Sequence, residues 1–544
     1  MVSQIKIGEY LIRQLAKYGI KHVFGIPGDF ILGFYDMLER CEHIRLITTC
    51  DEQGAGFAAD AYARVSGLGA VCVTYRAGAL KVANTIAQAY AEKSPVIIIS
   101  GAPGADEKQG SNLLHHPVSD FGVQKRVFDE FTVASTVLDS PATAQDEIDR
   151  VIHAALKFKR PVYIELPRDM VSVPCPAGHK EKREQETSDP GTLAEALHEA
   201  VALIDSAAQP VILAGVEIHR FGLQKELTAL ARNKGIPVAA TILAKSVVAD
   251  TRDFYMGIYE GATGLEDVCR YVESSDCLLL LGTFRTDLNL GMFTARLTQS
   301  IYATSEKISI KHIPFDNILF QDFIKGLSRA PISPRTIGNI PRPHPPRPIS
   351  NRRKSKVTLD SLFQHLNAFL KKDTIVIADA GATLSGANDL YIHRSMKFLS
   401  PAYYASPGFA VPGALGAQLA DPEFRPLVLV GDGAFQMTGM ELSSIARYGL
   451  NPIVIVINNQ GYSTERPTLD RPFNDVHPWQ FSKVPAVLGS GIGFIVETEE
   501  DLAKALLTAD QNTHGYTVID VKIGRDAQAL SRLRQAEKVQ TKTP

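Results

Sequence analysis

Two short segments in the last third of the chain carry residues that could hold a metal ion. Gly431-Asp432-Gly433 is followed, 24 residues later, by Asn458-Asn459-Gln460-Gly461, and each segment comes directly after a β-branched apolar run. Open parallel sheets bind ligands at the carboxyl edge of their strands. A carboxylate from Asp432, an amide oxygen from Asn459 and the Gly461 carbonyl are hard ligands that suit Mg²⁺ bound with phosphate oxygens. We therefore expect a Mg²⁺-phosphate site here; two unrelated strand-to-helix turns are the alternative.

Short apolar runs alternate with helical patterns along most of the chain. The runs predict strands at residues 22–26, 70–75, 95–100, 162–167, 210–215, 235–240, 277–282, 374–379, 427–430 and 453–457. Continuous apolar strands between helices are typical of parallel sheets that are covered on both faces. The expected fold class is α/β, with three consecutive doubly wound parallel-sheet domains.

Composition changes place the boundaries between these domains. A polar stretch at 178–190 reads as a linker, and residues 331–348 hold seven of the 31 prolines, as in an extended connector. The predicted domains are residues 1–180, 190–345 and 358–535, followed by a polar tail at 535–544.

The overall composition excludes several classes of protein. The 57 basic and 59 acidic side chains give a net charge of −2, which argues against a nucleic-acid partner. The apolar runs have strand length, so no membrane partner is expected. Six scattered cysteines without a Cys-x-x-Cys pair are typical of a reduced protein, and we expect a cytoplasmic location.

Taken together, these motifs resemble the thiamine-diphosphate-dependent 2-oxo acid decarboxylases over nearly the whole chain. That family carries Gly-Asp-Gly followed by Asn-Asn at a similar spacing. The resemblance implies a pyrimidine-binding first domain, a Rossmann-like middle domain and a diphosphate-binding third domain. It also implies that thiamine diphosphate and Mg²⁺ are the cofactors, and that a 2-oxo acid loses CO₂ without oxidation to leave an aldehyde.

The resemblance assigns a catalytic role to five residues. Glu52, in the segment 48–64, matches the glutamate that bonds the aminopyrimidine ring and so activates the cofactor. Asp29, His115, His116 and Glu465 match a proton-relay set, which must protonate a carbon and later remove a proton so that the aldehyde leaves.

The resemblance also assigns cofactor and substrate contacts. The carbonyl of Ala405 would accept a hydrogen bond from the cofactor, and Pro407 would support its bent shape. The remaining cofactor contacts are Glu52, Gly431, Asp432, Gly433, Ala434, Asn459, Gly461 and Tyr462. Ala382 and Thr464 match pocket positions, and their small size leaves room for an aromatic, branched or long 2-oxo acid side chain, as in phenylpyruvate or indolepyruvate decarboxylases.

Three positions depart from the family pattern. Asp51 stands where Asn or His is commoner, Pro407 where a bulky aliphatic residue is usual, and Arg76 where glycine is usual. Two alternatives stay open, and the second of them rests on Pro407 and Arg76. One is a thiamine-diphosphate-dependent carboligase or lyase, and the other is a cofactor-binding paralogue with impaired catalysis.

The middle domain lacks the Gly-x-Gly-x-x-Gly pattern of a dinucleotide site, so we expect it to support subunit packing. In the family, the first domain of one subunit faces the third domain of another. The resemblance therefore implies self-association as a homodimer or a dimer of dimers.

Overall fold

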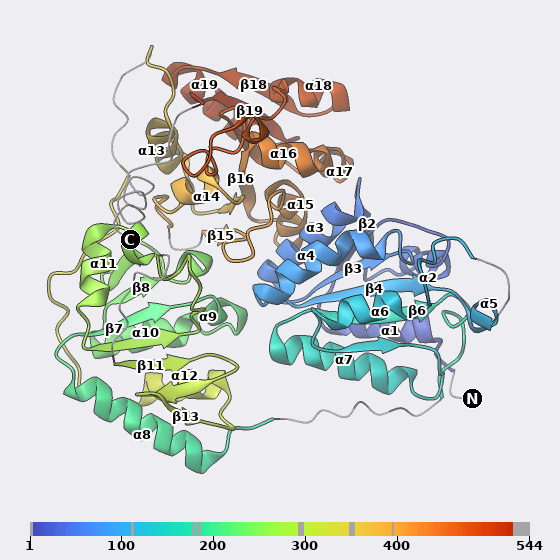
Figure 1. The fold of residues 1–544 in the computed structure, drawn as a ribbon, viewed down its shortest axis with the longest axis horizontal. Helices are drawn as coiled ribbons and strands as arrows, with labels where there is room; N and C mark the ends of the chain where they lie inside the picture. Colours follow the sequence, from blue (N-terminus) through green and yellow to red (C-terminus); the bar gives the residue numbers. More distant parts are fainter. Residues whose placement is uncertain are drawn as a thin grey trace.

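The computed structural model of the protein describes residues 4–109, 114–176, 179, 181, 186–291, 299–346, 354–393 and 396–525. Residues 178, 180 and 182–185 of the expected linker, the end of the connector at 331–348 and the tail at 535–544 lie outside the described residues. Three α/β units follow one another along the chain and occupy separate regions of the molecule, in blue to cyan, green, and orange to red (Figure 1). The predicted fold class is confirmed.

The first unit holds a six-stranded sheet, ordered β2-β1-β3-β4-β6-β5, whose pairings are all parallel. Its strands are β1 (His22–Gly25), β2 (Arg45–Thr48), β3 (Gly69–Val73), β4 (Val96–Ala102), β5 (Ser135–Val137) and β6 (Val162–Pro167). Its helices are α1 (Ile7–Lys17), α2 (Leu32–Glu39), α3 (Glu52–Ser66), α4 (Ala79–Ala91), α5 (Ala105–Gln109), α6 (Val123–Asp129) and α7 (Ala144–Phe158).

The middle unit has a seven-stranded sheet, ordered β13-β12-β11-β10-β7-β8-β9. Its strands are β7 (Pro210–Ala214), β8 (Val238–Ala240), β9 (Tyr255–Ile258), β10 (Cys277–Leu281), β11 (Ser300–Ala303), β12 (Ile308–Ile310) and β13 (Ile313–Phe315). Its helices are α8 (Pro190–Ser206), α9 (Glu217–Arg220), α10 (Gln224–Lys234), α11 (Glu266–Glu273) and α12 (Phe320–Arg329), with 3₁₀ turns η1 (Ile242–Ala244) and η2 (Gly261–Thr263). The edge strands β12 and β13 pair antiparallel, so this sheet is not wholly parallel as expected. Short hairpin connections allow antiparallel pairing without a crossover helix.

The third unit repeats the parallel pattern, with strand order β15-β14-β16-β17-β19-β18. Its strands are β14 (Thr374–Ala378), β15 (Lys397–Leu399), β16 (Arg425–Gly431), β17 (Ile453–Asn458), β18 (Ile492–Val496) and β19 (Thr517–Lys522). Its helices are α13 (Leu359–Phe369), α14 (Ala382–Ala387), α15 (Ala410–Ala420), α16 (Asp432–Thr438), α17 (Leu442–Arg447), α18 (Val484–Leu488) and α19 (Glu499–Gln511). The 3₁₀ turns are η3 (Gly439–Glu441), η4 (Pro472–Asn474) and η5 (Phe481–Lys483).

The first and third units share one hydrophobic core, in which helix α3 lies against helix α15. Small residues allow this close approach, because a side chain at Gly416 would place its Cβ 1.9 Å from the Ala58 carbonyl oxygen. Helix α3 therefore connects the first sheet to the third unit, and its amino-terminal residue is Glu52. Among the described residues, no helix is both long and apolar enough to cross a membrane.

Candidate functional site

Asp432 and Asn459 follow two neighbouring strands of the third sheet. Strands β16 and β17 pair in parallel, with Gly431 opposite Ile457, so both segments emerge at the same edge. Asp432 is buried, and its carboxylate accepts hydrogen bonds from the backbone nitrogens of Gly433 at 2.7 Å and Gly461 at 3.0 Å. The structure thus joins the two halves of the expected metal-binding motif.

The donor set at this edge fits a divalent cation. Burial raises the pKa of Asp432, against the opposing effect of the surrounding backbone N–H groups. No Lys, Arg or His of the described part of the chain forms an ion pair with this carboxylate. A buried carboxylate without a positive partner suits a metal ion, and Asn459 and Gly461 supply further oxygens of the type that Mg²⁺ prefers.

The three glycines of the motif have different surroundings. Gly431 faces open space, whereas Gly433 and Gly461 are in close contact with neighbouring residues. A Cβ at Gly431 would meet nothing within 4 Å, so this side can receive a ligand. A Cβ at Gly433 would lie 2.6 Å from the Tyr462 ring, and Gly461 has φ of +135° with its Cβ position 2.0 Å from the Asn474 carbonyl oxygen. Tyr462 therefore covers the Gly433 turn, whereas Gly461 satisfies a backbone conformation that other residues rarely adopt. Ala434 and Asn459 are also buried at this turn.

The segment around Ala405 is fixed by residues of helix α4 in the first domain. Ala405 itself has φ of +59°, a left-handed conformation that is strained for a residue with a side chain. The backbone nitrogens of Tyr403 and Tyr404 donate to the buried carboxylate of Glu92, which ends helix α4. On the other side of Ala405, the Ser406 hydroxyl accepts a hydrogen bond from Asn84 of helix α4. The Ala405 backbone is thus held in place from both sides, and Pro407, partly buried, follows it.

Asp379 anchors the end of the same segment. It follows strand β14 and is fully buried, and its carboxylate accepts from the backbone nitrogens of Gly408 at 3.0 Å and Ala410 at 2.8 Å. Burial raises its pKa to about 6, although these N–H groups oppose the shift. The sequence offered a signal for Asp379, because it ends a predicted strand at the same sheet edge as Asp432.

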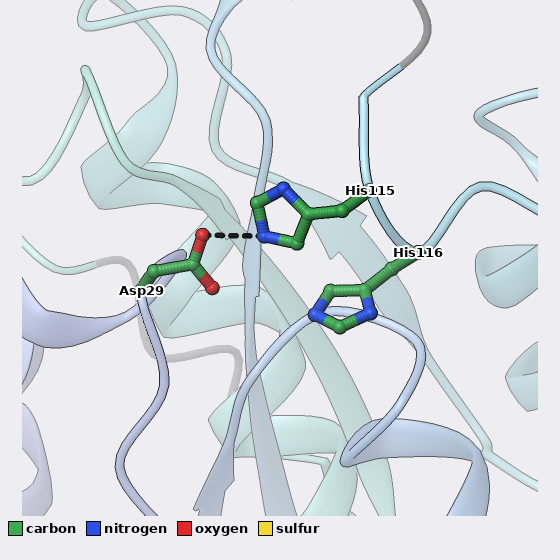
Figure 2. A group of neighbouring side chains, drawn as sticks. All are labelled: Asp29, His115 and His116. Atoms are coloured by element: carbon green, nitrogen blue, oxygen red, sulfur yellow. Dashed lines mark ion pairs between the residues drawn. The ribbon is translucent and has the colours of Figure 1, made fainter.

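Asp29, His115 and His116 meet at the surface of the first domain (Figure 2). Nε2 of His115 lies 2.7 Å from Oδ2 of Asp29, and the two imidazole rings have centroids 4.5 Å apart. The centroid of the Phe30 ring lies 5.0 Å from that of His115 and 6.1 Å from that of His116, so Phe30 packs against both rings. This group can exchange protons with a ligand that lies over it, because all three side chains are exposed.

Glu52 occupies the first turn of helix α3, and its carboxylate forms an ion pair with Lys81 at 2.8 Å. Lys81 also bonds the carboxylate of Asp51. Asp51 caps helix α3 by accepting a hydrogen bond from the Gln53 backbone nitrogen at 2.8 Å. A Cβ at Gly78 would lie 3.2 Å from the other oxygen of Glu52. The glutamate side chain is only 13% exposed.

The remaining predicted residues lie together in the third domain. Thr464 approaches the turn before Ala382, since a Cβ at Gly381 would lie 3.9 Å from the Thr464 methyl group. Glu465 is exposed in the following turn. Arg466 donates to the carbonyl oxygens of Asn459 and Gln460 and so fixes the loop that carries these residues.

Within one chain the predicted residues form two separate groups. Asp29, His115, His116 and Glu52 lie in the first domain, and the Mg²⁺-phosphate, pocket and Glu465 positions lie in the third. No hydrogen bond or ion pair between the two groups occurs among the described residues. Motif reasoning missed Lys81, Asp379, Glu441, Arg466 and Glu92, which hold the predicted residues. All of them except Arg466 act through contacts distant in sequence.

Comparisons with known proteins match all three domains. Models of the thiamine pyrophosphate enzymes match at residues 5–124 (N-terminal TPP binding domain), 197–316 (central domain) and 379–521 (C-terminal TPP binding domain). An indole-3-pyruvate decarboxylase of Azospirillum brasilense is 36% identical over 98% of both chains. An alpha-keto-acid decarboxylase of Mycolicibacterium paratuberculosis is 32% identical over 95% of this chain and 94% of its own. A probable pyruvate decarboxylase of Schizosaccharomyces pombe is 30% identical over 96% and 93%.

Proposed function

The chain belongs to the thiamine-pyrophosphate-dependent 2-oxo acid decarboxylases, and from this premise we propose that its substrate carries a large aromatic side chain, of the phenylpyruvate or indolepyruvate type. The protein is a carboxy-lyase that converts a 2-oxo acid into an aldehyde and CO₂ with thiamine pyrophosphate, also called thiamine diphosphate. The similarity to an indole-3-pyruvate decarboxylase along the whole chain is the observation that carries the substrate proposal.

The small side chains of Ala382 and Thr464 support a large substrate. Their turns approach each other beside Gly381, at the sheet edge that also carries Asp432. A bulky residue at either position would fill space that an aromatic ring needs, and even one methylene of pocket volume changes discrimination by about 10-fold to 200-fold.

In the proposed site, Asp432, Asn459 and Gly461 would hold a Mg²⁺ ion together with the diphosphate of the cofactor. Gly431, Gly433, Ala434 and Tyr462 shape the diphosphate turn, and Ala405 and Pro407 support the cofactor rings. When bound, the cofactor supplies a nucleophilic carbon and accepts the electrons that CO₂ leaves behind. Glu52 would bond the aminopyrimidine ring and so activate the cofactor.

In this proposal, four side chains transfer protons to and from the substrate. Asp29, His115, His116 and Glu465 would protonate the carbon that lost CO₂ and then take the hydroxyl proton as the aldehyde leaves. The 2.7 Å contact between Asp29 and His115 supports a shared proton in this group. The first three residues lie in the first domain and Glu465 lies in the third.

We propose that two copies of the chain complete each site, as a homodimer or a dimer of dimers. The third domain exposes a set of large apolar side chains beside the predicted site. These are Tyr403, Tyr404, Met437, Met440, Tyr462, Leu469 and Phe473. Exposed apolar groups on this scale are typical of a surface that another protein covers. The first domain of a second copy would bring Glu52 and the Asp29 group to this face, through a self-complementary twofold contact.

A cytoplasmic location is also part of the proposal. It is supported by the six cysteines, none of which forms a disulfide.

A substrate panel tests the substrate proposal. CO₂ release would be measured with phenylpyruvate, indolepyruvate, 3-methyl-2-oxobutanoate and pyruvate, with and without the cofactor and Mg²⁺. We expect the aromatic acids to have the highest kcat/KM, and Ala382→Phe to reduce this value for them more than for pyruvate. Pyruvate as the preferred substrate would contradict the proposal, acyloin as the main product would favour a carboligase, and a bound cofactor without CO₂ release would favour an impaired paralogue.

A further inference from the structure

Lys81 contacts two acidic side chains at the start of helix α3. Its ammonium nitrogen lies 2.8 Å from Oε2 of Glu52 and also bonds Oδ2 of Asp51. The hydrogen bonds to Asp51 and Glu52 raise the pKa of Lys81, so the group is an ammonium ion at neutral pH. Lys81 is half exposed, whereas Glu52 is nearly buried. Consequently, Lys81 covers the outer oxygen of the carboxylate that the cofactor needs.

Asp51 is a fixed anchor in this group of three. Its Oδ1 accepts a hydrogen bond from the Gln53 backbone nitrogen at 2.8 Å, so the side chain is held by helix α3 independently of Lys81. The lysine chain is flexible and carries a compact charge, so it can change partner at little cost. Its two acceptors belong to consecutive residues, and therefore a small movement breaks the contact with Glu52 while the contact with Asp51 is kept.

The Glu52 carboxylate has little freedom to avoid Lys81. The backbone at Gly78 closes one side, where a Cβ would lie 3.2 Å from Oε1 of Glu52. The second oxygen, Oε2, is the one that Lys81 occupies. A ring nitrogen that shares a proton with Glu52 would meet the ammonium charge at this oxygen, and two like charges in a partly buried site repel.

We propose that Lys81 is a positioning residue that pairs with the Glu52 carboxylate in the cofactor-free protein. When thiamine diphosphate binds and replaces Lys81 at Glu52, Asp51 retains the lysine ammonium. This inference rests on the proposed role of Glu52. In the free protein, Lys81 stabilises a nearly buried carboxylate that has no other positive partner among the residues that the structure describes. In the loaded protein, Asp51 keeps the ammonium away from the proton that Glu52 shares with the ring.

The affinity for thiamine diphosphate, measured by calorimetry at saturating Mg²⁺ and neutral pH, tests this proposal in four full-length proteins. They are the wild type, Asp51→Asn, Lys81→Met and the double variant. Asparagine retains the helix cap but loses the charge that holds Lys81. We expect Asp51→Asn to raise the Kd about twofold to fivefold, within the range of a partly exposed ion pair. Lys81→Met should lower the Kd, and the double variant should match Lys81→Met.

These signs separate the proposal from general electrostatics. The cofactor is an anion, so removal of a negative charge at Asp51 should strengthen its binding by simple attraction, and removal of Lys81 should weaken it. The proposal predicts the reverse for both. Lys371→Met is a matched control, because Lys371 forms an exposed ion pair with Asp510 at 2.6 Å, in a different domain. It should leave the Kd unchanged.

Four equal Kd values would overturn the proposal. So would a raised Kd in Asp51→Asn that remains raised in the double variant. Glu52→Gln separates this failure from a failure of the proposed function. If Glu52→Gln is folded and inactive while the four Kd values are equal, only the role of Lys81 is wrong. If Glu52→Gln retains full activity, the proposed role of Glu52 is wrong.

Discussion

Oε1 of Glu441 lies 3.0 Å from the backbone nitrogen of Asp51, so the third domain directly holds the segment that presents Glu52. Glu441 is buried, and it also accepts from the Cys50 backbone nitrogen at 3.1 Å. A Cβ at Gly54 of helix α3 would lie 2.1 Å from Oε1 of Glu441. Only glycine at this position therefore leaves room for the Glu441 carboxylate to pack against the helix. The position of Glu52 thus depends on a residue that lies nearly 400 positions away in the sequence.

Glu441→Ala should reduce both stability and activity. The change leaves the backbone N–H groups of Cys50 and Asp51 without their buried partner, and each such loss costs about 1–3 kcal/mol. We expect a lower Tm and a lower kcat, because Glu52 loses its support. Glu441→Gln retains an acceptor, so its Tm and kcat should lie between those of the wild type and those of Glu441→Ala. An alanine variant with unchanged Tm and kcat would show that this contact does not position Glu52.

Asp432→Ala should weaken the binding of Mg²⁺ and of thiamine diphosphate together. The carboxylate is buried and has no cationic partner in the described part of the chain, so the cost of its removal is confined to the N–H groups of Gly433 and Gly461, at about 1–3 kcal/mol each. Gel filtration followed by measurement of retained cofactor and metal would test this effect, with circular dichroism as the check on folding. Full retention of both ligands would remove Asp432 from the metal site.

Arg76 should affect proton delivery more than cofactor binding. It is buried with φ of +53°, its backbone nitrogen donates to Gln124 at 2.6 Å, and its guanidinium bonds the Asp120 carbonyl oxygen. These contacts hold the segment that follows His115 and His116. Its Nε and Nη1 have no hydrogen-bond partner among the described residues, so Arg76→Met should cost little stability.

With Arg76→Met, slower protonation of the reacting carbon should leave more time for capture by a second aldehyde. We therefore expect a lower kcat, an unchanged cofactor Kd and a higher ratio of acyloin to aldehyde, with partial recovery in Arg76→Lys. The ratio would be measured by chromatography. A product ratio equal to that of the wild type would show that Arg76 has no part in holding the relay.

Asp379 should make stability depend on pH in a predictable direction. Its pKa is raised to about 6 in the folded protein from an ordinary value of 3.8, so between these values the folded state binds more protons than the unfolded state. The contribution of this group to stability therefore rises as the pH falls through 6 and is lost as the pH rises again. Asp379→Asn removes this dependence.

The difference in Tm between the wild type and Asp379→Asn should consequently move in favour of the wild type from about pH 7.5 to about pH 5. Scanning calorimetry at the two pH values would measure this difference. A difference that is constant, or that moves toward the variant at low pH, would show that Asp379 does not titrate as the structure indicates.

Local patterns in the sequence predicted the sheet edge well, and contacts between domains less so. The runs before Asp432 and Asn459 are long and β-branched, and the structure places them in the neighbouring strands β16 and β17. Strands β12 and β13 have three residues each, too few for a periodic signal, and they form the antiparallel edge that was not expected. Glu441 and Lys81 belong to no motif, and only tertiary packing brings them to the residues that they hold.

Complementation between two inactive variants tests the central claim most directly, namely that Glu52 of one copy serves the metal site of another. Glu52→Gln and Asp432→Ala chains, differently tagged, would be produced together, and CO₂ release from phenylpyruvate would be measured. A hybrid dimer then keeps one intact site, so random pairing should restore about a quarter of the wild-type activity, because about half of the dimers are hybrids. Purified hybrids with no more activity than the two parents would contradict the account.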